Sequence, residues 1–185
     1  ALPRTSARMA LRPDIARLGA RRASPRTALR DSHRSARRST RLASHRHTGK
    51  DDAPFKFADA FPLLVTNTAS LAAVDARLQR QGHAGVTMNR FRPNIVLDGL
   101  PAFEEDYVRL LRIGPLAVRP VKACARCSVP GVDPETGEHS PLVPDVLAAM
   151  RASDDGVTFG VNAIVAGGAG ATLRVGDAVE VELRF

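Results

Sequence analysis

The sequence predicts a mostly β domain with a few short helices, in which the strands form a barrel-like sheet. Short apolar segments with β character recur from about residue 60 onward, and Gly and Pro residues separate them. Apolar residues at helical spacing occur in only a few places. The core must be aliphatic, because the chain has no Trp and only 4% aromatic residues among 44% hydrophobic ones. Many short strands with turn signals between them are typical of barrels.

The first expected elements are a strand, a helix and a second strand. Residues 62–66 form a short apolar run with β character. Apolar residues then follow at helical spacing, so we expect a helix over 70–78 with Ser70 as its N-cap. Residues 94–97 contain a short apolar run, which predicts a buried strand. Residues 104–111 fit a helical turn and a strand equally well.

The second half of the chain predicts three further strands and one helix. A strand is expected over 116–121, after the Gly-Pro pair at 114–115, and a helix over 142–151. Strands over 158–165 and 173–185 flank a Gly-rich stretch, which we interpret as a loop because it lacks the Lys and Ser/Thr of a phosphate-binding loop. In the last strand, apolar residues alternate with charged ones and share one face: Val179, Val181, Leu183 and Phe185.

Positive charge is concentrated in the first fifty residues. The chain has a net charge of +8 and a pI of about 10.8, values that are typical of nucleic-acid binding. Residues 1–50, however, hold thirteen Arg and one Lys against two Asp, so this segment carries +12 and the remainder −4. The segment has no sustained apolar period, which predicts disorder. We therefore expect one domain over 53–185, preceded by a disordered Arg-rich segment over 1–50.

Three interpretations of residues 1–50 remain open: a transit peptide, a basic arm that binds polyanions, or an artefact of an incorrect gene start or reading frame. The artefact is favoured, because Arg, Ala and Ser dominate the translation of GC-rich DNA in a wrong frame. We do not expect nucleic acid as a partner. No apolar run approaches the roughly 18–20 residues that span a bilayer, so we expect a soluble, cytoplasmic protein without a membrane partner.

Cys124 and Cys127 are the only cysteines, and they lie in one short run. A thiolate is a soft ligand that suits soft or redox-active metals. The pair cannot complete a four-ligand zinc site alone, and His139 is the only nearby His. Three explanations remain: one Cys binds a cofactor that brings its own ligands, the two form a redox couple, or both are inert. Two Cys are too few for a disulfide framework, which favours a reducing compartment.

Polar residues in two other segments are candidates for ligand binding. Arg90 and Arg92 precede a predicted strand, and their guanidinium groups suit oxyanions and carbonyl-rich heterocycles. Taken alone, such arginines are more often solvated charges at a strand edge. Asp59 lies between apolar residues and is either a cap or turn residue or an acceptor for the N–H groups of a pterin or purine. Asp133 lies in a predicted turn, where acids are usually solvated.

Six segments resemble those of one family and occur here in the family's order: 57–62, 69–71, 89–96, 111–114, 124–127 with 132–137, and 174–177. Together they look like the MOSC domain, which is named for the C-terminal domain of molybdenum-cofactor sulfurase. The resemblance covers roughly residues 53–185 and is strongest to the branch of the amidoxime-reducing component and its bacterial relatives, which reduce N-hydroxylated compounds.

The resemblance implies a MOSC-type β-barrel-like domain that binds the molybdenum cofactor, molybdopterin. It implies that Cys127 is the metal ligand and the catalytic residue, and that Asp59, Arg92 and Asn94 contact the pterin. Arg126 is also expected among the cofactor-binding residues. The implied activity is a molybdenum-dependent oxidoreductase, or its C-terminal part, with a small N-hydroxylated substrate and a separate flavin or iron–sulfur electron donor. The alternative is a non-catalytic cofactor or sulfur carrier, or an inactive truncated remnant.

The chain departs from the family pattern at several points. Pro130 and Gly131 stand where the family often has two Thr, and Ala125 stands where relatives often have Ser. Residues 1–50 do not resemble the upstream β-rich domain that supplies basic side chains for the cofactor's phosphate. The sulfurase itself also carries a pyridoxal-phosphate domain, and nothing in this chain matches the lysine site of that domain.

Overall fold

Seven strands close into a mixed barrel in the computed structural model, which describes residues 4–10, 41–49, 54–55 and 60–184. Adjacent strands are antiparallel, except that β4 and β5 are parallel. The predicted mostly β, barrel-like fold is therefore confirmed. In order around the barrel, the strands are β4 (Leu63–Asn67), β5 (Ile95–Asp98), β1 (Arg4–Ala10), β10 (Ala178–Leu183), β6 (Val108–Ile113), β7 (Leu116–Ala125) and β9 (Gly156–Gly167), which pairs again with β4.

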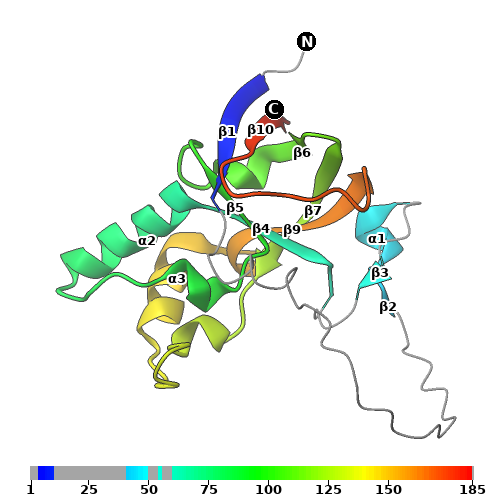
Figure 1. Cartoon of the computed structure of the whole chain (residues 1–185). Helices are drawn as coiled ribbons and strands as arrows, with labels where there is room; N and C mark the ends of the chain where they lie inside the picture. Colours follow the sequence, from blue (N-terminus) through cyan, green and yellow to red (C-terminus); the bar gives the residue numbers. More distant parts are fainter. Residues whose placement is uncertain (1–3, 11–40, 50–53, 56–59, 185) are drawn as a thin grey trace, which may run out of the picture.

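Short helices and one two-stranded sheet surround the barrel (Figure 1). The helix α2 (Thr68–Arg80) connects the parallel strands β4 and β5, and it packs with α3 (Leu142–Arg151) on one side of the barrel. A short α1 (His45–Thr48) lies beside β7. The remaining elements are the strand pair β2 (Arg41–Leu42) and β3 (Pro54–Phe55), the strand β8 (Ala152–Ser153) that pairs with β9, and the 3₁₀ helices η2 (Met88–Phe91), η3 (Glu104–Tyr107) and η4 (Val129–Gly131). In the described part of the chain, none of the helices has the length and apolarity needed to cross a membrane.

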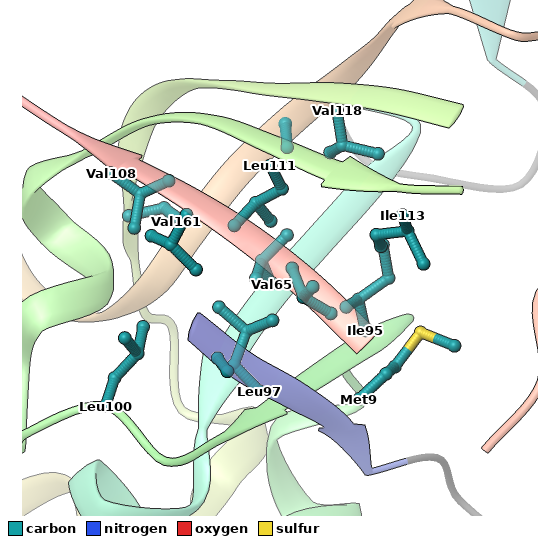
Figure 2. Packing of buried hydrophobic residues seen from close by; sticks show 14 of the residues in the cluster. Met9, Val65, Ile95, Leu97, Leu100, Val108, Leu111, Ile113, Val118 and Val161 are labelled. Atoms are coloured by element: carbon teal, nitrogen blue, oxygen red, sulfur yellow. The ribbon is translucent and has the colours of Figure 1, made fainter. Parts of the chain in front are cut away.

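Aliphatic side chains fill the barrel. All seven strands contribute to this cluster, and Figure 2 shows the labelled side chains pointing toward one another from opposite strands. Burial of apolar surface contributes roughly 25 cal/mol per Å², so this interior is the main source of stability. The aliphatic core that the sequence predicts is confirmed. The side chains labelled in Figure 2 are Met9, Val65, Ile95, Leu97, Leu100, Val108, Leu111, Ile113, Val118 and Val161.

The strand β1 is part of the barrel, so one sequence prediction needs correction. It lies between β10 and β5 and is antiparallel to both, with Thr5 opposite Val181 and Met9 opposite Leu97. Ala7 and Met9 are buried in the core. The expectation that all of residues 1–50 is disordered is wrong for 4–10 and 41–49. Thr5, Ala7 and Met9 alternate as a strand requires, but three small or apolar residues in a segment so rich in Arg are too weak a signal to predict a strand.

The helix α2 begins two residues before its predicted start. Asn67 is its N-cap, and the Asn67 side-chain oxygen accepts a hydrogen bond from the Ala69 N–H at 3.3 Å. Ser70, the predicted cap, is buried inside the helix. Its hydroxyl donates to Glu105 Oε2 at 2.7 Å and accepts from the Phe103 N–H at 2.8 Å. The helix predicted over 142–151 has the same bounds in the structure.

Glu105 is completely buried beneath the start of α2. One of its carboxylate oxygens accepts from Ser70, and the other, Oε1, has no partner among the described residues. Burial disfavours the charged form and raises the pKa of Glu105, although the hydrogen bond from Ser70 opposes this shift. The undecided segment 104–111 is a helical turn, η3, followed by a strand, β6.

The strands β4 and β9 approach so closely that one position requires glycine. Gly160 has a φ of +72°, and a Cβ there would lie 2.6 Å from the Val65 carbonyl oxygen. A side chain at this position would meet both an unfavourable backbone conformation and a clash with β4. This glycine therefore allows the barrel to close.

Candidate functional site

The cysteine run lies at the end of a barrel strand. β7 continues past its predicted end at 121 and carries Cys124, while Cys127 follows in the segment that leads to η4. Both thiols are free, and Cys124 is half-buried whereas Cys127 is exposed. The Arg126 N–H donates to the Val157 carbonyl of β9 at 2.8 Å. This bond fixes the backbone one residue before Cys127.

Residues 89–96, which contain Arg90 and Arg92 and which we call the arginine-rich run, cover most of η2 and the turn that follows it. Arg92 adopts the left-handed conformation, with φ 56° and ψ 45°. This region is costly for residues with a Cβ, and such strain concentrates at functional sites. The Arg92 side chain is exposed and has no hydrogen bond or ion pair to a described residue. The structure thus presents this guanidinium to solvent.

Asn94 holds the two parallel strands together. Its side-chain oxygen accepts from the Leu64 N–H at 2.7 Å, and its own N–H donates to the Leu64 carbonyl at 2.9 Å. The predicted role of Asn94 in cofactor binding would therefore fall to its side-chain NH₂ group. Asp59, the other predicted pterin contact, lies outside the described residues.

Two arginines join the arginine-rich run to the cysteine run. Arg90 Nη2 lies 2.6 Å from Asp133 Oδ2, and Arg90 Nη1 donates to the Pro130 carbonyl at 3.5 Å. In the other direction, Arg126 Nη2 donates to the Phe91 carbonyl at 3.0 Å. Residues about 40 positions apart in the chain are thereby held side by side.

The Arg126 side chain is used within the protein. Besides its bond to Phe91, its Nη1 lies 3.2 Å from Cys124 Sγ, and its guanidinium lies 5.8 Å from the centre of the Phe91 ring. Phe91 itself stacks on Phe159 at a centroid distance of 4.0 Å, within the apolar layer under α2 and α3. Arg126 Nε is buried and has no partner among the described residues.

The turn after Cys127 is organised around Asp133. Asp133 Oδ1 accepts from the N–H groups of Glu135 and Thr136, at 2.8 and 3.2 Å. These backbone hydrogen bonds, and then the charge of Arg90, lower the pKa of Asp133. The expectation of a solvated charge is therefore wrong for Arg90, whose side chain is only 14% exposed, whereas Asp133, at 31%, meets solvent and is also ion-paired with Arg90.

The close packing around Gly131 accounts for the absence of the second Thr that the family often has at this position. A Cβ on Gly131 would lie 2.6 Å from the Ser140 carbonyl oxygen, so Thr would not fit here unless the turn moved. The Gly131 carbonyl in turn accepts from the Ser140 N–H at 2.8 Å. The Pro-Gly pair is thus part of a tightly packed turn beside Cys127.

A family model described as MOSC domain matches residues 52–180. The chain belongs to the MOSC domain family. It is 36% identical over 138 residues to the human mitochondrial amidoxime reducing component 2, a match that covers 66% of this chain and 38% of that protein. It is 35% identical over 113 residues to the molybdenum cofactor sulfurase of Caenorhabditis elegans, which covers 60% of this chain and 15% of the relative. The chain therefore spans less than two-fifths of the length of these relatives.

A solved structure has the same fold. The YuaD protein from Bacillus subtilis superposes with a TM-score of 0.54 at 13% sequence identity, over 79% of this chain and 76% of that protein. At this identity the likeness concerns the fold. The family resemblance that the sequence motifs predicted is confirmed by the MOSC match and by the amidoxime-reducing relatives.

The structure links two of the predicted site segments of this MOSC domain through the hydrogen bond from Arg126 to the Phe91 carbonyl. Among the predicted residues that are described, Cys127 and Arg92 are exposed, and their preceding neighbours, Arg126 and Phe91, are hydrogen bonded. Sequence reasoning missed the ion pair between Arg90 and Asp133. Its signal is faint: one basic and one acidic residue in two motifs that the family resemblance already links. In the described part of the chain, no three His, Cys, Asp or Glu side chains gather to hold a metal ion.

Proposed function

We propose that this MOSC domain binds the molybdenum cofactor through Cys127 and takes part in the reduction of N-hydroxylated compounds. The observation that carries the proposal is that Cys127 and Arg92 are both exposed and that the residues just before them, Arg126 and Phe91, are hydrogen bonded to each other. The similarity to amidoxime reducing components supports the same activity.

The residues present fit this cofactor. Cys127 offers a soft donor at the surface, and thiolates are preferred ligands of soft and redox-active metals. Arg92 offers a guanidinium that suits an oxyanion or the carbonyl of a pterin. The Asn94 NH₂ group supplies a further donor, because the side-chain oxygen already accepts from Leu64. When bound, the cofactor would supply the two-electron redox centre of the reaction.

The proposed reaction balances as a two-electron reduction. An N–OH group takes up two electrons and two protons, the N–O bond breaks, and the products are N–H and water. The electrons come from a separate flavin or iron–sulfur protein. A reducing compartment such as the cytoplasm would keep Cys124 and Cys127 as thiols.

Molybdenum content tests the proposal. The chain and its Cys127→Ala variant are expressed in a host that makes the cofactor, and molybdenum per folded protein is measured by elemental analysis. We expect near-stoichiometric metal in the wild type and almost none in the variant. The matched control is Cys124→Ala, which removes the other thiol and is expected to keep most of the metal.

Two outcomes would contradict parts of the proposal. Equal, near-zero molybdenum in the wild type and Cys127→Ala would end the claim of cofactor binding. Bound molybdenum without turnover of an amidoxime, when a chemical reductant replaces the donor protein, would instead identify a cofactor carrier.

A further inference from the structure

Two arginines connect the two motifs that flank the candidate site, and the side chain of each bonds to the motif that the other belongs to. Arg90 belongs to η2 but bonds to the turn after Cys127, through Asp133 and the Pro130 carbonyl. Arg126 belongs to the cysteine run but bonds to the Phe91 carbonyl at the end of η2. Each motif thus holds the other through one guanidinium group. We call these two contacts the arginine clamp.

The clamp brackets Cys127 on both sides. Arg126, the residue just before it, is anchored to Phe91 through its side chain and to Val157 through its N–H. Six residues after Cys127, Asp133 is anchored to Arg90, and its other oxygen is occupied by the N–H groups of its own turn. The exposed Cys127 therefore sits in a segment whose two ends are both fixed to the arginine-rich run.

The same contacts determine where Arg92 lies. Arg92 follows Phe91 directly, and its strained left-handed backbone needs support from its surroundings. Arg90 and Phe91, the two residues before it, are both held by the clamp. Hydrogen bonds to charged groups are stronger than those between neutral ones, so the clamp favours one conformation of this segment.

We propose that Arg90 and Arg126 are positioning residues, and that the clamp fixes Cys127 relative to Arg92 so that both can engage one ligand. This inference rests on the proposed function for the identity of that ligand. It also gives Arg126 a role different from the expected cofactor contact, because its two Nη atoms are bonded within the protein.

Hydrogen exchange tests the clamp without any cofactor. Arg90→Ala, Asp133→Ala and the double variant are compared by exchange at the Gly131 and Val132 amides, whose N–H groups bond within the turn to Ser128 and Val129. We expect roughly tenfold faster exchange in each single variant, because the turn loses its ion pair to η2. The double variant should exchange more slowly than the two single effects combined predict, because both substitutions remove the same ion pair, although each also removes bonds of its own to the turn.

Matched controls separate positioning from general destabilisation. Arg112→Ala removes an arginine that bonds to a different acid, Glu182, at 3.2 Å on the barrel wall, and should leave the turn unchanged. Barrel amides of β10 serve as the internal reference for global unfolding. If an alanine variant fails to fold, Asp133→Asn keeps the shape of the side chain and removes its charge. Unchanged exchange at Gly131 and Val132, or strictly additive effects in the double variant, would overturn the proposal.

Cofactor loading provides the second test. Molybdenum per folded protein should fall several-fold in Arg90→Ala and recover in part in Arg90→Lys, which restores the charge. Arg126→Ala should both lower the metal content and speed exchange in the cofactor-free protein. If Arg126→Ala lowers metal content with no change in exchange, Arg126 contacts the cofactor and its assignment as a positioning residue is wrong.

The two proposals fail in different ways. A wild type without molybdenum, combined with fast exchange in the Arg90 and Asp133 variants, would refute the proposed function but support the mechanical role of the clamp. A wild type that holds molybdenum, together with an Arg90→Ala variant that holds as much and exchanges as slowly, would refute the clamp alone.

Discussion

Truncating Met9 should destabilise the whole barrel. Met9 is only 1% exposed and belongs to the same core cluster as Leu97, its partner on β5. The strand β1 that carries it fills the space between β5 and β10. Met9→Ala removes three heavy atoms from a closed interior, and the surrounding strands are joined edge to edge and can collapse into the resulting cavity only in part.

The size of the effect follows from this burial. Replacing a buried Met with Ala costs about 2–5 kcal/mol, and we expect the upper half of that range because Met9 is almost fully enclosed. Domains are stable by only about 5–15 kcal/mol, so the loss is a large share of the total. For a protein of this length, that loss should lower the melting temperature by roughly 7–20 °C.

Urea and thermal unfolding followed by far-ultraviolet circular dichroism would measure the change, since the chain has no Trp for fluorescence. Arg8→Ala is the matched control, because Arg8 is the neighbouring residue of the same strand and is exposed. It should change the free energy of unfolding by less than about 0.5 kcal/mol. Equal stability of Met9→Ala and the wild type would refute the placement of β1 in the barrel.

Two further predictions concern buried and crowded positions. The raised pKa of Glu105 means that the native state holds this proton more tightly than the unfolded chain, where the pKa of Glu is about 4.3. This proton stabilises the native state fully below that pH, and its contribution is lost as pH rises through the native pKa. Glu105→Gln cannot titrate, so the free energy of unfolding of this variant should depend less on pH in that range. The same pH dependence in the variant and the wild type would contradict the raised pKa. Gly160→Ala should cost about 1–3 kcal/mol or more in urea unfolding, whereas Gly167→Ala in the same strand, where a Cβ would lie 3.6 Å from its nearest neighbour, should cost far less. If both variants lost the same free energy of unfolding, the close approach of β4 to Gly160 would not be the cause of the loss.

Most of the barrel could be predicted from the sequence because its strands carry local signals. The alternation of Val179, Val181 and Leu183 correctly indicates the core face of β10. The same pattern does not predict the burial of Glu182 on the opposite face of the strand. The Glu182 side chain is only 8% exposed and forms ion pairs with Arg109 and Arg112 of β6. Burial alone would raise the pKa of Glu182, but the hydrogen bonds and charges of these arginines lower it. Partners on neighbouring strands determine this outcome, and no local pattern reports them.

The candidate site could be predicted only as a set of residues. The family motifs indicate Cys127 and Arg92, and the structure shows both at the surface. The contact of Arg90 with Asp133 spans 43 residues and depends on how η2 meets η4, which is a result of folding. Nothing in the alternation or spacing of this segment distinguishes the half-buried Arg90 from the exposed Arg92.

The position of β1 has a consequence for how the chain assembles. In the strand register Arg4 of β1 lies opposite Glu182 of β10, so the barrel closes between the first strand to be synthesised and the last. Loop closure over such a separation is entropically costly, and proteins rich in distant contacts fold slowly. Until β10 has been made, the edges of β1 and β6 stay unpaired and can join other chains. We expect refolding yield to fall with protein concentration, and nascent chains that lack β10 to depend on chaperones.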